Sequence, residues 1–228
     1  MVEIDYRLVD NNKPIAIVGE SDSGKTNLLI YLSKLCKSKK QIVILGYPIK
    51  LEGIDLISST DDFNKLSNCV LLIDEFGIYI DKYEHGTNKK LQELIRLCAH
   101  NNVKLIVSTQ ISQDFDKTTE SLIKTWICKQ INIHTLKNGS SVKKSLQSLK
   151  HSNINSMGIR LEQNEYTWVN YESKVIGENR IYDFPYQNIG KDYTRKNDMF
   201  STLSVENPQN NSQKSPDGKF TIINNENY

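Results

Sequence analysis

Residues 19–26 could bind the phosphates of a nucleoside triphosphate. They read Gly-Glu-Ser-Asp-Ser-Gly-Lys-Thr and fit the pattern G-x-x-x-x-G-K-[ST] without exception. Gly19 and Gly24 can adopt backbone angles closed to other residues, which lets successive N–H groups turn toward phosphates at the positive end of a helix. Lys25 would span the terminal phosphates, and the Thr26 hydroxyl would bind Mg²⁺. The predicted nucleotide-binding residues are Gly19, Glu20, Ser21, Asp22, Ser23, Gly24, Lys25, Thr26 and Asn27.

Two adjacent carboxylates, Asp74 and Glu75, follow the apolar run 69–73. Five consecutive apolar residues indicate a strand that is covered on both faces, and such sheets bind ligands at the carboxyl ends of their strands. We expect Asp74 to complete the Mg²⁺ shell and Glu75 to orient and deprotonate an attacking water. The pair therefore favours hydrolysis of the nucleotide.

A third polar group, Gln110, ends the strand-like run 103–110. An amide can donate a hydrogen bond to one oxygen while it accepts another from water, so Gln110 is predicted to sense the terminal phosphate or the attacking water. A strand that ends in Ser-Thr-Gln is also typical of the ordinary start of a loop. The interpretation depends on the order of the three motifs along the chain.

Strand-like and helix-like segments alternate around these motifs. This order predicts a three-layer α/β fold, in which a mainly parallel sheet carries helices on both faces and a C-terminal β-hairpin follows. Residues 177–179 are expected to form the turn of that hairpin, and Trp126 is expected in a helix. The first dozen residues read as a lead-in. The expected strands cover residues 15–18, 41–45, 69–73, 103–110, 127–133, 165–171 and 180–184, with a helix over about 88–100.

Length and composition predict one domain, residues 1–185, which carries the three motifs of the expected P-loop ATPase, and a polar, flexible tail, residues 186–228. The net charge of +2 is unlike that of a basic nucleic-acid coat protein. The cysteines lie far apart in apolar segments and are expected to be reduced and packed. No apolar run approaches the roughly 20 residues of a membrane span, so we expect a protein of the host-cell cytoplasm.

The order of GESDSGKT, LLIDE, a helix and LIVSTQ resembles the FtsK-HerA superfamily of P-loop ATPases, and within it the small viral members that package genomes. The resemblance covers approximately residues 13 to 185. It implies a RecA/ASCE-like P-loop NTPase that uses ATP and Mg²⁺ and pumps double-stranded DNA as a homo-oligomeric ring, a hexamer or a pentamer. It also implies Gln110 as the glutamine sensor, a capsid or portal-like partner, and association with the virion.

The chain departs from the superfamily at one position. Relatives often carry an arginine near the end of the helix before the sensor strand, where this chain has Ala99 and His100. Arg96 is the candidate replacement, because the helical apolar spacing places it on the outer surface, within reach of a neighbouring subunit. A local ion pair with Glu93 is the alternative interpretation of Arg96.

Residues 117–150 hold seven lysines and one acidic residue, Glu120. This segment could contact the DNA backbone in the pore of a ring, which would carry no base information, although a solvated lysine surface is equally consistent. Two other functions remain open. One is an AAA+-like loader or secretion-type ATPase that acts on protein or single-stranded DNA. The other is a nucleotide-gated interaction protein with slow hydrolysis. The lysines are Lys117, Lys124, Lys129, Lys137, Lys143, Lys144 and Lys150.

Overall fold

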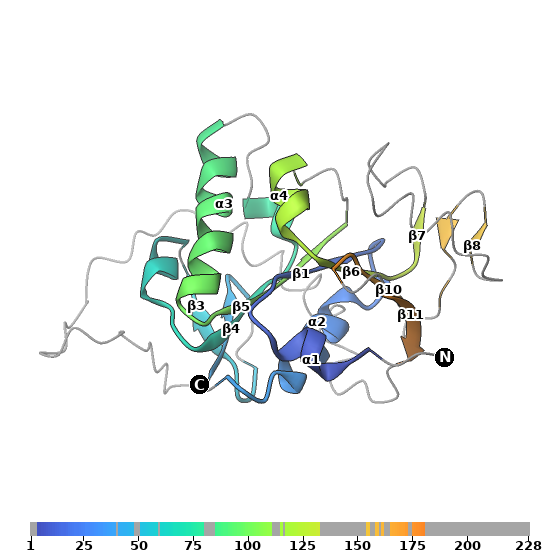
Figure 1. Ribbon diagram of the computed structural model, residues 1–228, viewed down its shortest axis with the longest axis horizontal. Helices are drawn as coiled ribbons and strands as arrows, with labels where there is room; N and C mark the ends of the chain where they lie inside the picture. Colours follow the sequence, from blue (N-terminus) through green and yellow to red (C-terminus); the bar gives the residue numbers. More distant parts are fainter. Residues whose placement is uncertain are drawn as a thin grey trace, which may run out of the picture. The chain divides into compact units, whose positions relative to one another are not determined.

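An eight-stranded sheet forms the centre of the computed structural model (Figure 1). Six neighbouring strands are parallel, and the last two strands of the chain add an antiparallel hairpin at one edge. The predicted mainly parallel sheet with a terminal hairpin is confirmed. Across the sheet the order is β11 (Val175–Arg180), β10 (Glu165–Asn170), β6 (Thr125–Cys128), β1 (Ile15–Val18), β5 (Lys104–Thr109), β4 (Cys69–Ile73), β2 (Gln41–Leu45) and β3 (Asp55–Ile57).

The structure describes residues 4–39, 41–47, 51–58, 60–79, 85–110, 115, 117–132, 154–155, 158–159, 161, 165–172 and 175–180. All of them belong to one compact unit, Met1–Gly190. The predicted tail, residues 186–228, lies outside the described residues and stays a prediction.

Helices cover both faces of the sheet (Figure 1). None of the helices in the described part of the chain has the length and apolar character needed to cross a membrane. The α-helices are α1 (Tyr6–Asp10), α2 (Lys25–Leu35), α3 (His85–His100) and α4 (Lys117–Leu122), with 3₁₀ turns η1 (Thr60–Lys65) and η2 (Phe76–Tyr79). A separate small sheet contains β7 (Ile131–Asn132), β9 (Gly158–Ile159) and β8 (Ile154–Asn155).

Alternation along β1 divides the hydrophobic core into two layers. Ala16 and Val18 join the buried cluster that includes α3, whereas Ile15 and Ile17 join the cluster that includes α1 and α2. Successive side chains of a strand point to opposite faces, so a continuous apolar run is needed when helices cover both. Each fully buried aliphatic side chain contributes about 1.5–3 kcal/mol relative to exposure. The same two-sided burial fixes the strands that carry the polar motifs.

Two segments differ from their sequence-based prediction because of contacts within the sheet. Trp126 lies in β6, not in a helix, since it is in register with Ala16 on one side and Val169 on the other. Gly177 lies inside β11, directly opposite Trp168, and does not form the turn of the hairpin. A Cβ atom at position 177 would lie 2.6 Å from Trp168 Nε1. This glycine is therefore required by the indole that packs on it.

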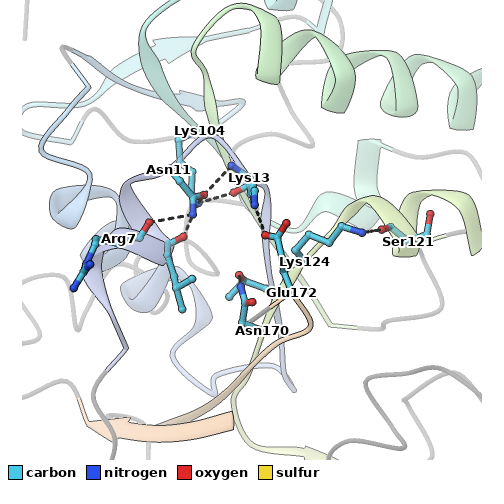
Figure 2. Close-up of polar contacts among 10 residues, drawn as sticks. Arg7, Asn11, Lys13, Lys104, Ser121, Lys124, Asn170 and Glu172 are labelled. Carbon is cyan, nitrogen blue, oxygen red and sulfur yellow. Dashed lines mark hydrogen bonds and ion pairs between the residues drawn. The ribbon is translucent and has the colours of Figure 1, made fainter. Parts of the chain in front are cut away.

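The first residues, which the sequence predicts only as a lead-in to the first strand, contain the short helix α1, and a buried lysine of β5 fixes this helix (Figure 2). Lys104 Nζ donates to Leu8 O at 3.1 Å, Asn11 Oδ1 at 3.2 Å and Lys13 O at 2.5 Å. These acceptors include a carbonyl from the end of α1, where backbone oxygens have no partner within the helix. Burial lowers the pKa of Lys104 to about 7.

The buried Lys104 predicts a pH-dependent stability. The unfolded chain holds this proton up to about pH 10.5, whereas the folded chain releases it near pH 7, so stability rises with pH between these values. Relative to Lys104→Met, the free energy of unfolding of the wild type should rise by up to about 1.4 kcal/mol per pH unit above pH 7. Urea unfolding of both proteins from pH 6 to about pH 8.5 measures this difference. Parallel pH curves would contradict the prediction.

The four cysteines are buried and free, which confirms the prediction of packed thiols. Burial raises the pKa of Cys36 and Cys69 to about 11 and that of Cys98 and Cys128 to about 12. At neutral pH all four are therefore protonated, and none is an activated nucleophile.

Candidate nucleotide-binding site

The phosphate loop leaves the sheet between two neighbouring strands. Val18, the last residue of β1, is in register with Thr109 of β5 and Cys128 of β6. Beyond it, Gly19 N donates to Thr109 O at 3.3 Å, and Glu20 N donates to Gln130 O at 2.9 Å. The loop is thus anchored to the strands on both sides, at the carboxyl edge where open α/β sheets bind their ligands.

The two glycines of the loop are needed for different structural reasons. Gly24 has φ +87° and begins α2, so it uses the left-handed region that glycine tolerates. Gly19 is not among the described glycines with positive φ, contrary to the prediction for this position. A Cβ atom at Gly19 would lie 2.7 Å from Lys129 Cβ and 2.7 Å from Ser23 Oγ. Gly19 is therefore required by close packing.

Lys25 lies between the phosphate loop and the acidic strand. Its side chain is 5 % exposed, and Nζ donates to Glu20 O at 2.9 Å and lies 3.5 Å from Glu75 Oε1. The ammonium thus bridges the two motifs that the sequence predicts to bind phosphate and activate water. Within the described residues, the buried hydroxyl of Ser23 in the same loop has no hydrogen-bond partner.

The two predicted metal ligands are in direct contact. Thr26 Oγ1 donates to Asp74 Oδ2 at 2.7 Å. A hydroxyl and a carboxylate side by side fit Mg²⁺, which prefers oxygen ligands and takes the others from water and substrate phosphates. In the part of the chain that is described, no group of three His, Cys, Asp or Glu side chains could form an all-protein metal site. A pair of protein oxygens of this kind suits a metal that also binds water and nucleotide phosphates.

Glu75 occupies a strained turn at the end of β4. Its φ is +47°, a left-handed conformation that costs a non-glycine residue about 1–2 kcal/mol. Its backbone N–H donates to Asp74 Oδ1 at 3.2 Å and to Ser108 Oγ at 3.1 Å. The side chain, which is 30 % exposed, faces Lys25. The sequence gives no signal for Ser108 beyond its place one residue inside a polar strand end.

Gln110 directly follows Thr109, so β5 delivers it to the same edge of the sheet as the phosphate loop. Its side chain is exposed. Among the described residues no hydrogen bond joins it to Lys25 or Glu75. Its role as a sensor therefore remains a prediction that is consistent with its position.

Arg96 is exposed on α3 and lies away from the phosphate loop of its own chain. Just after α3, Asn101 O accepts a hydrogen bond of 2.9 Å from Asn68 N, which immediately precedes β4. The end of α3 that carries Arg96 is thus at the amino edge of the sheet, opposite the edge that carries Asp74. No ion pair joins Arg96 to Glu93 within the described residues, so the local ion pair is not observed.

The lysine-rich segment is only partly a solvated surface. Lys129 is fully buried, its Nζ donates to Glu165 O, and burial lowers its pKa to about 7. This lysine cannot contact a DNA backbone, because its ammonium group lies in the protein interior. Lys137, Lys143, Lys144 and Lys150 lie outside the described residues, and their predicted role is not tested.

The fold is similar to that of solved structures of a viral DNA-packaging ATPase, a secretion ATPase and a conjugation coupling protein, which confirms the expected P-loop NTPase fold and bears out the resemblance at that level only. No protein-family model and no curated protein sequence matches the chain. The likeness comes from solved structures at identities below 20 %, which carry the fold and not the function.

Three of these structures show the different kinds of protein that share the fold. The DNA-packaging ATPase B204 of Sulfolobus turreted icosahedral virus has a TM-score of 0.54 at 16 % identity, over 76 % of this chain and 100 % of its own. The cytoplasmic domain of the Thermomonospora curvata type VII secretion ATPase EccC has a TM-score of 0.52 at 11 % identity, over 80 % and 25 %. The pCW3 conjugation coupling protein TcpA has a TM-score of 0.50 at 14 % identity, over 82 % of this chain and 66 % of its own.

Proposed function

We propose that the protein is a Mg²⁺-dependent ATPase. The observation that carries this proposal is the convergence of Lys25, Thr26, Asp74 and Glu75 at the phosphate loop, joined by contacts of 2.7–3.5 Å. Solved structures of B204 from Sulfolobus turreted icosahedral virus 2 in complex with AMPPCP and with ATP-γ-S support the choice of nucleotide, because that protein shares this fold.

Each residue of the group has a separate task in hydrolysis. Backbone amides of the loop and the Lys25 ammonium bind the phosphates, and the Thr26 hydroxyl and Asp74 carboxylate would hold Mg²⁺. When bound, Mg²⁺ supplies neutralisation of the phosphate charge. Glu75 orients a water and accepts its proton on the carboxylate. To reach the terminal phosphates, Lys25 exchanges its contacts with Glu20 O and Glu75 for phosphate oxygens.

The finer proposal is a DNA translocase that packages a viral genome. B204, which is a DNA-packaging ATPase, is matched over its full length by 76 % of this chain, and this supports the choice of a packaging ATPase. Arg96 is exposed and lies at the edge of the sheet opposite the phosphate loop of its own chain, so it cannot reach the phosphates bound there. In a homo-oligomeric ring, Arg96 of one subunit would instead approach the phosphates bound by a neighbouring subunit. Arginines supplied in this way stabilise the transition state of phosphoryl transfer.

A second candidate is a secretion-type ATPase that acts on protein. It is favoured by the likeness to EccC, which has also been solved in complex with a signal sequence peptide. That protein is much longer, however, and this chain covers 38 % of the EccC chain that was solved with the peptide. We therefore place DNA translocation first.

Duplex DNA should stimulate ATP hydrolysis by a translocase, and the stimulation should rise steeply with protein concentration as rings form. Steady-state hydrolysis measured over a range of protein concentrations, with and without long double-stranded DNA, tests this expectation. Single-stranded DNA of equal phosphate content and an unfolded polypeptide serve as comparison partners. Equal, slow rates under all conditions would favour the nucleotide-gated interaction protein, and stimulation by polypeptide alone would favour the secretion-type ATPase.

A further inference from the structure

Ser108 lies at the junction of the two acidic residues and the sensor strand. It belongs to β5 and is fully buried, and its position is two residues before Gln110. Its hydroxyl donates to Asp74 Oδ1 and accepts a hydrogen bond of 3.1 Å from the backbone N–H of Glu75. One hydroxyl group therefore contacts both residues that the proposed reaction needs at the end of β4.

The two oxygens of the Asp74 carboxylate have different hydrogen-bond partners. Oδ2 receives the Thr26 hydroxyl, whereas Oδ1 receives Ser108 and, at 3.2 Å, the Glu75 N–H. Hydrogen bonds on Oδ1 fix the rotation of the carboxylate and so determine the direction in which Oδ2 and its lone pairs point. Water cannot easily replace the serine, because the side chain is completely enclosed.

The contact with Glu75 supports a conformation that is unfavourable by itself. A glutamate with φ +47° persists only where its surroundings hold it. Its N–H has two acceptors, Asp74 Oδ1 and Ser108 Oγ, and the serine oxygen is the nearer of the two. The left-handed turn aims the Glu75 side chain toward Lys25, where the phosphates are expected.

We propose that Ser108 is a positioning residue for hydrolysis: its hydroxyl sets the orientation of the Asp74 carboxylate and stabilises the strained backbone of Glu75. This inference rests on the proposed ATPase function. Because Gln110 directly follows β5, the strand that carries Ser108, the same hydroxyl also links the strand before the predicted sensor to the Asp74 carboxylate and the Glu75 backbone. Partners of this kind, which hold a metal-binding carboxylate, change activity or metal affinity by about 10- to 100-fold when they are removed.

The test compares Ser108→Ala and Ser108→Cys with the wild type. Cysteine keeps the approximate shape of serine but donates only weakly, so it tests the hydrogen bonds without a cavity. For both variants we expect kcat to fall by about 10- to 100-fold. We also expect a higher Mg²⁺ concentration to be needed for half-maximal binding of AMPPCP, a measurement that does not depend on turnover.

Ser33→Ala is the matched control. Ser33 is a buried serine of α2 whose hydroxyl donates to Ile30 O at 2.7 Å, away from the acidic pair. The Ser33→Ala variant should keep the wild-type kcat and Mg²⁺ requirement, although it also loses a buried serine hydroxyl oxygen. If Ser108→Ala does not fold, Ser108→Cys decides the question.

The experiment distinguishes a failure of the proposed ATPase function from a failure of the proposed role of Ser108. A wild-type protein without ATP hydrolysis and without Mg²⁺-dependent AMPPCP binding would overturn the proposed function. A wild-type protein with both activities, matched by Ser108→Cys in kcat and Mg²⁺ requirement, would overturn the role of Ser108 alone. A loss in Ser33→Ala as large as that in the Ser108 variants would overturn it as well, since the effect would then follow general destabilisation.

Discussion

Glu75→Gln should bind ATP with nearly the wild-type affinity and lose turnover by about 100- to 10,000-fold, the range by which a positioned general base contributes. The amide keeps the size of the side chain and the backbone N–H bonds to Asp74 and Ser108, so the strained turn can persist. It cannot accept the proton of the attacking water. It also removes the charge that faces Lys25 at 3.5 Å, which frees the ammonium for phosphate.

Single-turnover hydrolysis and equilibrium ATP binding measure the two halves of this prediction separately. Glu52→Gln makes the same chemical change at an exposed position in the turn before β3 and should be neutral in both assays. Unchanged turnover in Glu75→Gln would remove Glu75 as the base. Loss of ATP binding together with turnover would assign it a structural role instead.

Gly19→Ala should reduce kcat/KM for ATP by about 100-fold, the effect of displacing reacting groups by about 1 Å. The added methyl group would lie 2.7 Å from Lys129 Cβ, an atom fixed by the buried strand β6, and 2.7 Å from Ser23 Oγ. Since β6 is held in the middle of the sheet, the phosphate loop must move away from it. The loop then loses its hydrogen bonds to Thr109 O and Gln130 O.

The control for this variant is Gly53→Ala. Gly53 has φ +72° but no atom within 4 Å of an added Cβ, so it tests backbone strain without a steric clash. We expect it to cost about 1–2 kcal/mol of stability and to leave ATP binding unchanged. ATP affinity from equilibrium binding and melting temperature from calorimetry distinguish the two glycines. Wild-type affinity in Gly19→Ala would show that the loop tolerates the displacement.

The sequence predicted the parts of this site whose chemistry is local. The phosphate loop, the acidic pair and their strands follow from short patterns, because the apolar runs 15–18 and 69–73 each fill a strand buried on both faces. The proximity of Thr26 and Asp74 also follows, since parallel strands bring their carboxyl ends to one edge.

The sequence could not predict the features that depend on contacts between distant segments. A lysine in an apolar strand ordinarily indicates an exposed edge, but Lys104 is buried because α1 and the following loop supply three oxygen acceptors. Gly177 resembles a turn residue until Trp168 is placed opposite it. In each case the decisive partner comes from another element, which no local pattern records. Ser108 belongs to the same group, as its partners lie more than 30 positions away.

The packing of Gly19 against Lys129 and Gln130 has a consequence for synthesis of the protein. The backbone and side-chain atoms that close around the loop are translated more than 100 residues after it. At ordinary rates of elongation this delay is roughly 5 to 20 seconds. A nascent chain therefore carries the nucleotide-binding motif long before it can retain a nucleotide. Under the proposed function, cellular ATP would stabilise only those chains in which β6 has already joined the sheet.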